Sequence, residues 1–271
     1  MDEQCYVCKS SNLEKVNLPL SENSDNLHIL VCQDCGYARR SGGMAFDKNI
    51  ETQQEVFDKI IQTPKSKPKW PNRLKLIASK VVSLTGKKGK VLDIGCGTGM
   101  WLCCFGDEWD KFGVEVSSVR ANVAAKVTKA EVFCGPIEQY DSKSILFDLI
   151  TAFALIEHLT DPKYLLKWIN GHLKQNGLLV LMTGDRESEE AKKLGRNWPL
   201  YRPIEHVSFF SSRALRYLIE DAGFDIICEE WRYSGYANNS VLYRCLAKAK
   251  EIMGIVKSPK YSHYYVYVRK R

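Results

Sequence analysis

The chain has 271 residues, of which 45% are hydrophobic and 26% are charged, and its formal net charge is +7. These values are typical of a folded protein with one large domain, or one domain and a small appendage. No apolar stretch reaches the 18 or so residues that a membrane-spanning helix needs. The first residues lack the basic and apolar regions of a signal peptide, so we expect a cytoplasmic protein. The mild positive charge suits anionic substrates such as phosphates or nucleotide sugars, and RNA equally.

Four of the ten cysteines form two Cys-x-x-Cys pairs, Cys5 with Cys8 and Cys32 with Cys35. In a reducing compartment, pairs at this spacing favour a metal site over disulfides. Four thiolates suit tetrahedral Zn²⁺ and leave no open position for water, so we expect a structural zinc ribbon over residues 1–45. Because so short a segment cannot build a core, metal binding would supply most of its folding free energy. Four free or redox-active cysteines are the alternative.

Residues 46–86 have the pattern of a helical linker. A helical pattern over residues 49–61 is interrupted by prolines, and an amphipathic helix is expected over residues 73–84. From residue 87 to residue 271, strand and helix patterns alternate, as a doubly wound parallel sheet requires.

Seven strands are expected in that second part, the last one antiparallel. They are residues 90–94, 111–116, 130–133, 147–153, 177–183, 224–231 and 264–268. A further amphipathic helix is expected over residues 239–256, packed on the sheet or on a second subunit. The sequence therefore predicts an α/β protein with a Rossmann-like, doubly wound sheet of seven strands and a small N-terminal zinc ribbon.

The run from Val91 to Gly99 is the most distinctive local motif. An apolar strand ends in Asp93, and glycines follow at alternate positions: Gly95, Gly97 and Gly99. Glycines let the backbone turn sharply and approach a ligand, and the helix expected after them would present free N–H groups. A dinucleotide fingerprint places its third glycine one residue later, where this chain has Met100. The spacing indicates a nucleotide-like cofactor of a different kind.

The Asp-x-Gly-x-Gly-x-Gly form of the loop resembles motif I of the class I S-adenosylmethionine (SAM) methyltransferases. A nicotinamide site and a fortuitous tight turn are the alternatives. The resemblance implies that Asp93 lies near the methionine amino group of SAM and that the three glycines pass under the cofactor. Glu115, at the end of the second strand, would bind both ribose hydroxyls. The plainer interpretation of Glu115 is a solvated acid at a strand end.

Two later segments extend the resemblance to the cofactor site. Pro136 and Ile137 follow the third strand, where the family contacts adenine. Phe153 and Ala154 end the fourth strand, where the family places the transferring methyl group. All of these positions follow the carboxyl ends of successive strands, which meet at one edge of a parallel sheet.

The segment after the fifth strand, about residues 184–212, concentrates aromatic and basic residues, and we expect it to cap the acceptor. Its candidate substrate-binding residues are two arginines and two aromatic residues: Arg186, Trp198, Tyr201 and Arg202. The arginines can hold a phosphate or carboxylate, and the aromatic rings can stack on a ring of the substrate. The alternatives are solvated arginines and hydrophobic packing within the cap.

Two histidines are candidates for catalysis. His206 is the first candidate for a general base, because histidine ordinarily titrates near neutral pH. Its alternative role is to anchor the loop through a backbone hydrogen bond. His158 is the second candidate, in a Glu-His pair that resembles the family's segment after the fourth strand, and its alternative role is positioning.

The succession of His206, Phe210, a helix and Ala222-Gly223-Phe224 resembles a subgroup of small-molecule methyltransferases. The resemblance implies SAM-dependent methyl transfer to a small polar acceptor, foremost a hydroxyl of a sugar or nucleotide-linked sugar in glycan or specialised-metabolite biosynthesis. A sugar C-methyltransferase family also carries an N-terminal zinc module, although it is longer than this chain.

Two other functions stay open from the sequence. The first is an RNA base methyltransferase, in which the zinc ribbon and a lysine-rich strip over residues 65–73 would grip RNA. The absence of an Asn-Pro-Pro-Tyr-like motif after the fourth strand disfavours methylation of exocyclic amines. The second is a binding module without catalysis, which the intact glycine loop and Glu115 disfavour.

Overall fold

The computed structural model of the chain describes residues 4–18, 28–41, 72–201, 205–232 and 261–271. In these ranges no helix is long and apolar enough to cross a membrane. The helices expected over residues 49–61 and 239–256 lie outside the described residues, as does most of the lysine-rich strip.

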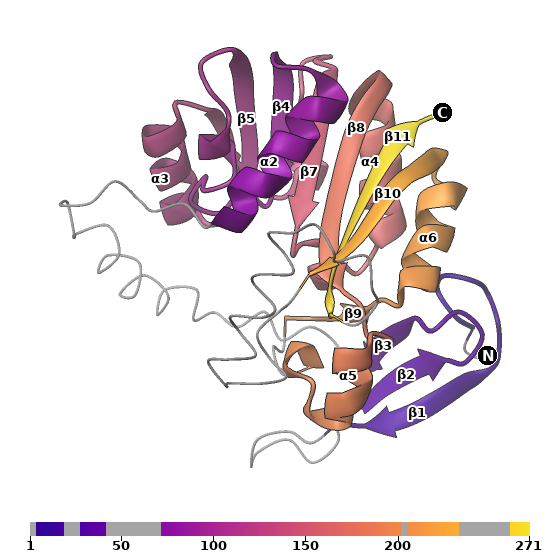
Figure 1. Cartoon of the computed structure of the whole chain (residues 1–271). Helices are drawn as coiled ribbons and strands as arrows, with labels where there is room; N and C mark the ends of the chain where they lie inside the picture. Colours follow the sequence, from indigo (N-terminus) through magenta and orange to yellow (C-terminus); the bar gives the residue numbers. More distant parts are fainter. Residues whose placement is uncertain (1–3, 19–27, 42–71, 202–204, 233–260) are drawn as a thin grey trace.

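The main body is a seven-stranded sheet in the order β10-β11-β8-β7-β4-β5-β6 (Figure 1). Its strands are β4 (Gly89–Ile94), β5 (Trp109–Glu115), β6 (Glu131–Cys134), β7 (Phe147–Phe153), β8 (Leu173–Gly184), β10 (Phe224–Arg232) and β11 (His263–Lys270). Strands β4 to β8 pair in parallel, and β11 is antiparallel to both β10 and β8. The predicted fold class, including the antiparallel last strand, is confirmed.

The sheet has apolar side chains on both faces, and helices pack against each face and bury them. Within the described residues, four helices cover it: α2 (Asn72–Thr85), α3 (Ser118–Thr128), α4 (Pro162–His172) and α6 (Ser212–Asp221). Neighbouring residues of a strand point to opposite faces. Val91 accordingly packs in the cluster that contains Ile77 of α2. Leu92 packs in the cluster that contains Leu165 of α4 and Leu215 of α6.

The prediction of a helix directly after the glycine loop is wrong, because the described structure has only the 3-10 turn η2 (Leu102–Cys104) there. Gly99 and Gly106 bracket the segment. Starting an α-helix fixes several residues for one hydrogen bond, and flanking glycines raise that cost. Instead, Trp101 and Phe105 are buried with their ring centroids 5.1 Å apart.

The N-terminal segment shares a second sheet with a distant part of the chain. Its strands β1 (Leu13–Asn17), β2 (His28–Cys32) and β3 (Ala38–Ser41) are joined by β9 (Ser208–Phe209) in the order β1-β2-β3-β9. In the register, Ala38 pairs with Phe209 and Arg39 pairs with Ser208. Figure 1 shows this small sheet beside α5 (Glu189–Leu194), beyond the end of the large sheet at which β7 ends.

Candidate active site

The glycine loop follows β4 at the carboxyl edge of the large sheet. All three glycines have positive φ: +76° at Gly95, +55° at Gly97 and +79° at Gly99. A Cβ atom on Gly99 would lie 2.5 Å from the side chain of Thr128, so this glycine lets α3 pack closely. A Cβ atom on Gly97 would meet nothing within 4 Å. Gly97 therefore faces open space that a ligand can enter.

Glu115, at the end of β5, holds this loop. Its two carboxylate oxygens accept hydrogen bonds from the backbone N–H groups of Gly97 and Ser117, each at 2.9 Å. A carboxylate oxygen has two lone-pair directions, so each one can accept a second hydrogen bond. A pair of ribose hydroxyls would supply those donors. The open space at Gly97 and the acceptors of Glu115 together fit the nucleoside of SAM.

Asp93 is the last residue but one of β4 and is held by the neighbouring strand β7. The Thr151 hydroxyl donates a hydrogen bond of 2.6 Å to its carboxyl group. Burial raises the pKa of Asp93 to about 7, and the negative charge of Glu115 adds to the rise. A bound cationic group would favour ionised Asp93. Thr151 is not among the residues predicted from the sequence, although a hydroxyl among the buried apolar residues in the second half of β7 was the available signal.

The residues expected near adenine and the methyl group lie at the same edge of the sheet. Pro136 and Ile137 lie at the start of the 3-10 turn η3 (Ile137–Gln139) after β6; Pro136 is exposed and Ile137 is buried. Phe153 ends β7 and packs on Trp101 with ring centroids 5.0 Å apart. Ala154 is exposed with a φ of +49°, a backbone conformation that non-glycine residues rarely adopt and that concentrates at functional sites.

Glu157, His158 and His206 form a second group next to these residues. The first two lie on the 3-10 turn η4 (Ile156–His158), and the third precedes β9. Their potential ligand atoms all lie within 4.8 Å of one another. The backbone N–H of Val207 donates to the carbonyl of Glu157 at 2.9 Å, and Thr183 donates to the Glu157 carboxyl group at 2.8 Å.

Burial controls the protonation of this group. It lowers the pKa of His206 to about 4, with His158 as a smaller cause, and it lowers the pKa of His158 as well. Both rings are therefore neutral at pH 7. Nδ1 of His206 lies 2.9 Å from the Leu200 carbonyl, and Nδ1 of His158 lies 3.2 Å from the Glu205 carbonyl. A carbonyl only accepts, so Nδ1 carries the proton and Nε2 carries the lone pair.

The expected substrate-binding residues of the cap have structural contacts. Trp198 is 1% exposed and meets Tyr201 edge to face, with ring centroids 5.0 Å apart, in an apolar cluster. Arg186 donates a 2.8 Å hydrogen bond to the carbonyl of Gly36. Arg202 lies outside the described residues. The burial of Trp198 and Tyr201 favours the packing alternative, and substrate binding by all four residues stays a prediction.

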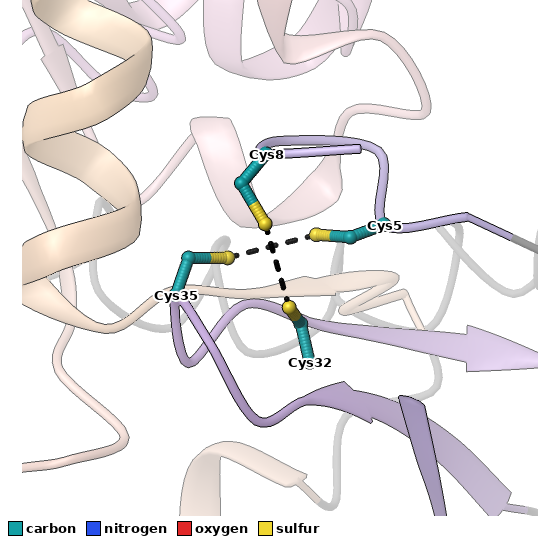
Figure 2. Close-up of side chains that lie close together, drawn as sticks. All are labelled: Cys5, Cys8, Cys32 and Cys35. Atoms are coloured by element: carbon teal, nitrogen blue, oxygen red, sulfur yellow. Dashed lines mark hydrogen bonds between the residues drawn. The ribbon is translucent and has the colours of Figure 1, made fainter. Parts of the chain in front are cut away.

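The four N-terminal cysteines converge on one point, as Figure 2 shows. The sulfur atoms of Cys5 and Cys35 lie 3.6 Å apart, those of Cys8 and Cys32 lie 3.5 Å apart, and all four lie within 4.8 Å of one another. Tetrahedral Zn²⁺ with Zn–S bonds of about 2.3 Å separates its sulfur ligands by about 3.8 Å. The cluster therefore fits a four-coordinate zinc ion.

Comparison with known proteins agrees with the geometry. A family model described as a methyltransferase domain matches residues 67–229. The ubiquinone biosynthesis O-methyltransferase of Bradyrhizobium diazoefficiens is 33% identical over 119 residues, which cover 40% of this chain and 41% of that protein. The aligned part thus spans about two fifths of this curated relative's length.

Solved structures share the fold at low sequence identity. A SAM-dependent methyltransferase from Thermotoga maritima is 20% identical, with a TM-score of 0.57, over 82% of this chain and 97% of that one. The plantazolicin methyltransferase BpumL in complex with SAH is 17% identical, with a TM-score of 0.55, over 83% and 92% of the two chains. The family match and these similarities confirm the resemblance that the sequence indicated: the chain belongs to the methyltransferase-domain family and has the fold of SAM-dependent methyltransferases.

Proposed function

We propose that this protein transfers a methyl group from SAM to a hydroxyl of a small polar acceptor, foremost a sugar or nucleotide-linked sugar. One observation carries the proposal. The Glu115–Gly97 cradle and the His158–His206 pair lie beyond the carboxyl ends of parallel strands of one sheet. A nucleoside site and a proton acceptor thus occupy the edge where open α/β sheets bind their ligands.

Bound SAM would supply a methyl group that its sulfonium already activates. The protein then has to align the acceptor and remove its proton. Neutral His206 takes the proton of the hydroxyl on Nε2, while its Nδ1–H stays bonded to the Leu200 carbonyl. His158 positions the acceptor from the neighbouring ring. Glu115 would hold the ribose and Asp93 the methionine amino group, and Phe153 with Ala154 would line the path of the methyl group.

Two observations support an oxygen atom as the acceptor. The curated relative is named an O-methyltransferase. A histidine whose Nε2 carries a free lone pair suits a hydroxyl, because oxygen has to lose its proton during transfer, whereas a neutral amine can attack with its lone pair first. The net charge of +7 supports an anionic or sugar-phosphate acceptor.

The N-terminal ribbon holds Zn²⁺ in a structural role in this proposal. All four cysteines converge, so no coordination position is left for water or substrate. The ion would stabilise the turns that carry the cysteines.

The experiment is transfer of labelled methyl from SAM into a fractionated cell extract. Asp93→Ala and His206→Asn are the two controls, because one acts on the cofactor and the other on the acceptor. Label in the small-molecule fraction, lost in both variants, supports the proposal and provides the acceptor for mass spectrometry. Label in RNA would establish the RNA methyltransferase instead. The absence of label from every fraction contradicts the proposed activity.

A further inference from the structure

The second cysteine knuckle is bound by the catalytic domain through three consecutive backbone carbonyls. Those of Asp34, Cys35 and Gly36 accept hydrogen bonds from three side chains of the segment 186–213. The donors are Arg213 at 2.9 Å, Ser211 at 2.6 Å and Arg186 at 2.8 Å. The backbone of this knuckle is therefore in direct contact with the cap. Two of the four proposed metal ligands, Cys32 and Cys35, lie in the same knuckle.

Strand β3 continues this contact towards the histidine pair. It leaves the knuckle and pairs with β9, two residues beyond His206. Beside that pairing, the backbone N–H of Arg40 donates to the carbonyl of Val207 at 3.0 Å. The backbone N–H of Val207 in turn donates to the carbonyl of Glu157, the residue before His158. Three backbone segments, from β3, β9 and η4, are thus hydrogen-bonded in series.

The side chain of Arg40 donates hydrogen bonds to two backbone carbonyls, one of His206 and one of Tyr201. Its Nε donates to the carbonyl of His206 at 2.9 Å, and its Nη2 donates to the carbonyl of Tyr201 at 2.7 Å. Arg40 is only 7% exposed, so water competes little for these carbonyls. A guanidinium donates in several fixed directions at once, which suits a clamp on two carbonyls.

Tyr37, the residue before β3, makes a second contact between the ribbon and the segment of His206. The hydroxyl groups of Tyr37 and Ser208 lie 2.9 Å apart, and both residues are buried. Ser208 follows His206 by two positions and donates to the carbonyl of Leu159, next to His158. The ribbon thus contacts the chain both before and after His206, at Tyr201 and at Ser208.

We propose that the metal-bound ribbon is a positioning element of the acceptor site, and that Arg40 is the residue that transmits its geometry to His206. This inference rests on the proposed function only in assigning the acceptor to the histidine pair. Binding of the metal fixes the second knuckle, the knuckle fixes the start of β3, and Arg40 on β3 fixes the loop of His206. Loss of the metal or of the Arg40 clamp loosens the acceptor site and leaves the SAM cradle intact.

Hydrogen exchange of the full chain, followed at the Val207 amide, tests the inference without an acceptor. In Arg40→Gln, which cannot clamp both carbonyls, we expect exchange about tenfold faster than in the wild type. Arg40→Lys should lie between the two, because an ammonium group can still donate to one carbonyl. Arg216→Gln is the matched control, since Arg216 pairs with Glu229 away from the ribbon, and it should leave exchange at Val207 unchanged.

Metal removal by a chelator is the second test. Calorimetry with SAM then measures whether the cofactor site formed by Glu115 and Gly97 is unchanged. We expect the metal-free chain to repeat the faster exchange at Val207, with SAM affinity within about twofold of the loaded chain. Methyl transfer to the acceptor fraction should fall at least about tenfold in Arg40→Gln.

Either of two results overturns the inference. One is unchanged exchange at Val207 in both Arg40→Gln and the metal-free chain. The other is a loss of SAM affinity of about the same factor as the increase in the exchange rate at Val207. The ribbon would then support the whole fold and not the acceptor site alone. A wild-type chain that transfers no methyl group refutes the proposed function, yet the exchange comparison still decides whether the ribbon positions His206.

Discussion

The imidazole rings of His158 and His206 meet edge to face, with centroids 4.6 Å apart and planes at 80°. The residues are 48 positions apart in the chain, and each ring is oriented by a backbone carbonyl: that of Glu205 for His158 and that of Leu200 for His206. Side chains that contact each other rarely contribute independently. The pair should therefore behave as one unit in methyl transfer.

His206→Asn should lower methyl transfer roughly 100-fold, because general-base catalysis typically contributes that much, and should leave SAM affinity unchanged. Rates with the acceptor fraction and calorimetry with SAM provide the measurement. His172→Asn is the matched control, since His172 stacks on Trp168 in α4, away from the histidine pair. A His206→Asn protein with wild-type turnover would exclude His206 as the base.

The pH profile should show the burial of His206. The ring accepts a proton only when it is neutral, and its pKa lies at about 4. The part of the acid limb of kcat/KM that is lost in His206→Asn should therefore lie near pH 4 and not near the ordinary histidine value of about 6.5, whereas Asp93 titrates near pH 7 in both proteins. A limb between pH 6 and 7 that disappears in His206→Asn would contradict the burial argument.

Gly97→Arg should abolish SAM binding and leave the fold intact. The Cβ atom of the new side chain meets no atom of the protein within 4 Å, and the longer arginine side chain would fill the open space beside Glu115. The positive φ adds a strain of about 1 kcal/mol. Gly171→Arg is the control, since this exposed helical glycine also has open space around it. Calorimetry that finds unchanged SAM affinity in Gly97→Arg would refute the cofactor assignment.

Glu157→Gln should change how stability depends on pH. Burial raises the pKa of Glu157 to about 7, above the ordinary 4.5, so the folded state binds this proton more tightly than the unfolded state. The resulting stabilisation is complete below pH 4.5 and is lost as the pH rises through 7. Because glutamine does not titrate, the variant should gain about 3 kcal/mol relative to the wild type over this interval.

Urea unfolding at pH 4.5 and pH 8 measures this shift. Glu138→Gln is the control, because Glu138 is exposed on η3. An equal difference in unfolding free energy between variant and wild type at the two pH values would show that Glu157 is not shifted.

Cys5→Ser combined with Cys8→Ser should release about one zinc ion per chain, because removal of two thiolates leaves too few ligands for a tetrahedral site. Elemental analysis of wild type and variant measures the metal. The double variant Cys103→Ser and Cys104→Ser is the control, since these cysteines lie in η2 outside the cluster. A wild-type protein without metal would refute the zinc assignment.

The large sheet and the contact between Glu115 and the glycine loop could be predicted from the sequence because their signals are local. Apolar runs mark β4 and β7, and glycines with positive φ follow the first of them. Glu115 stood at the expected distance after the loop, and its contact with Gly97 agrees with the expected role. The spacing of the paired cysteines predicted the four-cysteine cluster in the same way.

The acceptor side depended on contacts between distant segments. Arg40 follows the second knuckle with no periodic pattern, and only the pairing of β3 with β9 brings its guanidinium to the carbonyl of His206. Arg186 and Trp198 looked suited to a ligand, yet the one binds Gly36 and the other is buried.

Local sequence thus determined the strands, the glycine loop and the cysteine cluster, because backbone conformation and ligand spacing act over a few residues. Tertiary structure alone decided that the ribbon joins the cap in one sheet, and that Glu157, His158 and His206 meet. The physical reason is that burial and hydrogen bonding between segments, which set the protonation of His206 and the position of its loop, exist only once the chain has folded.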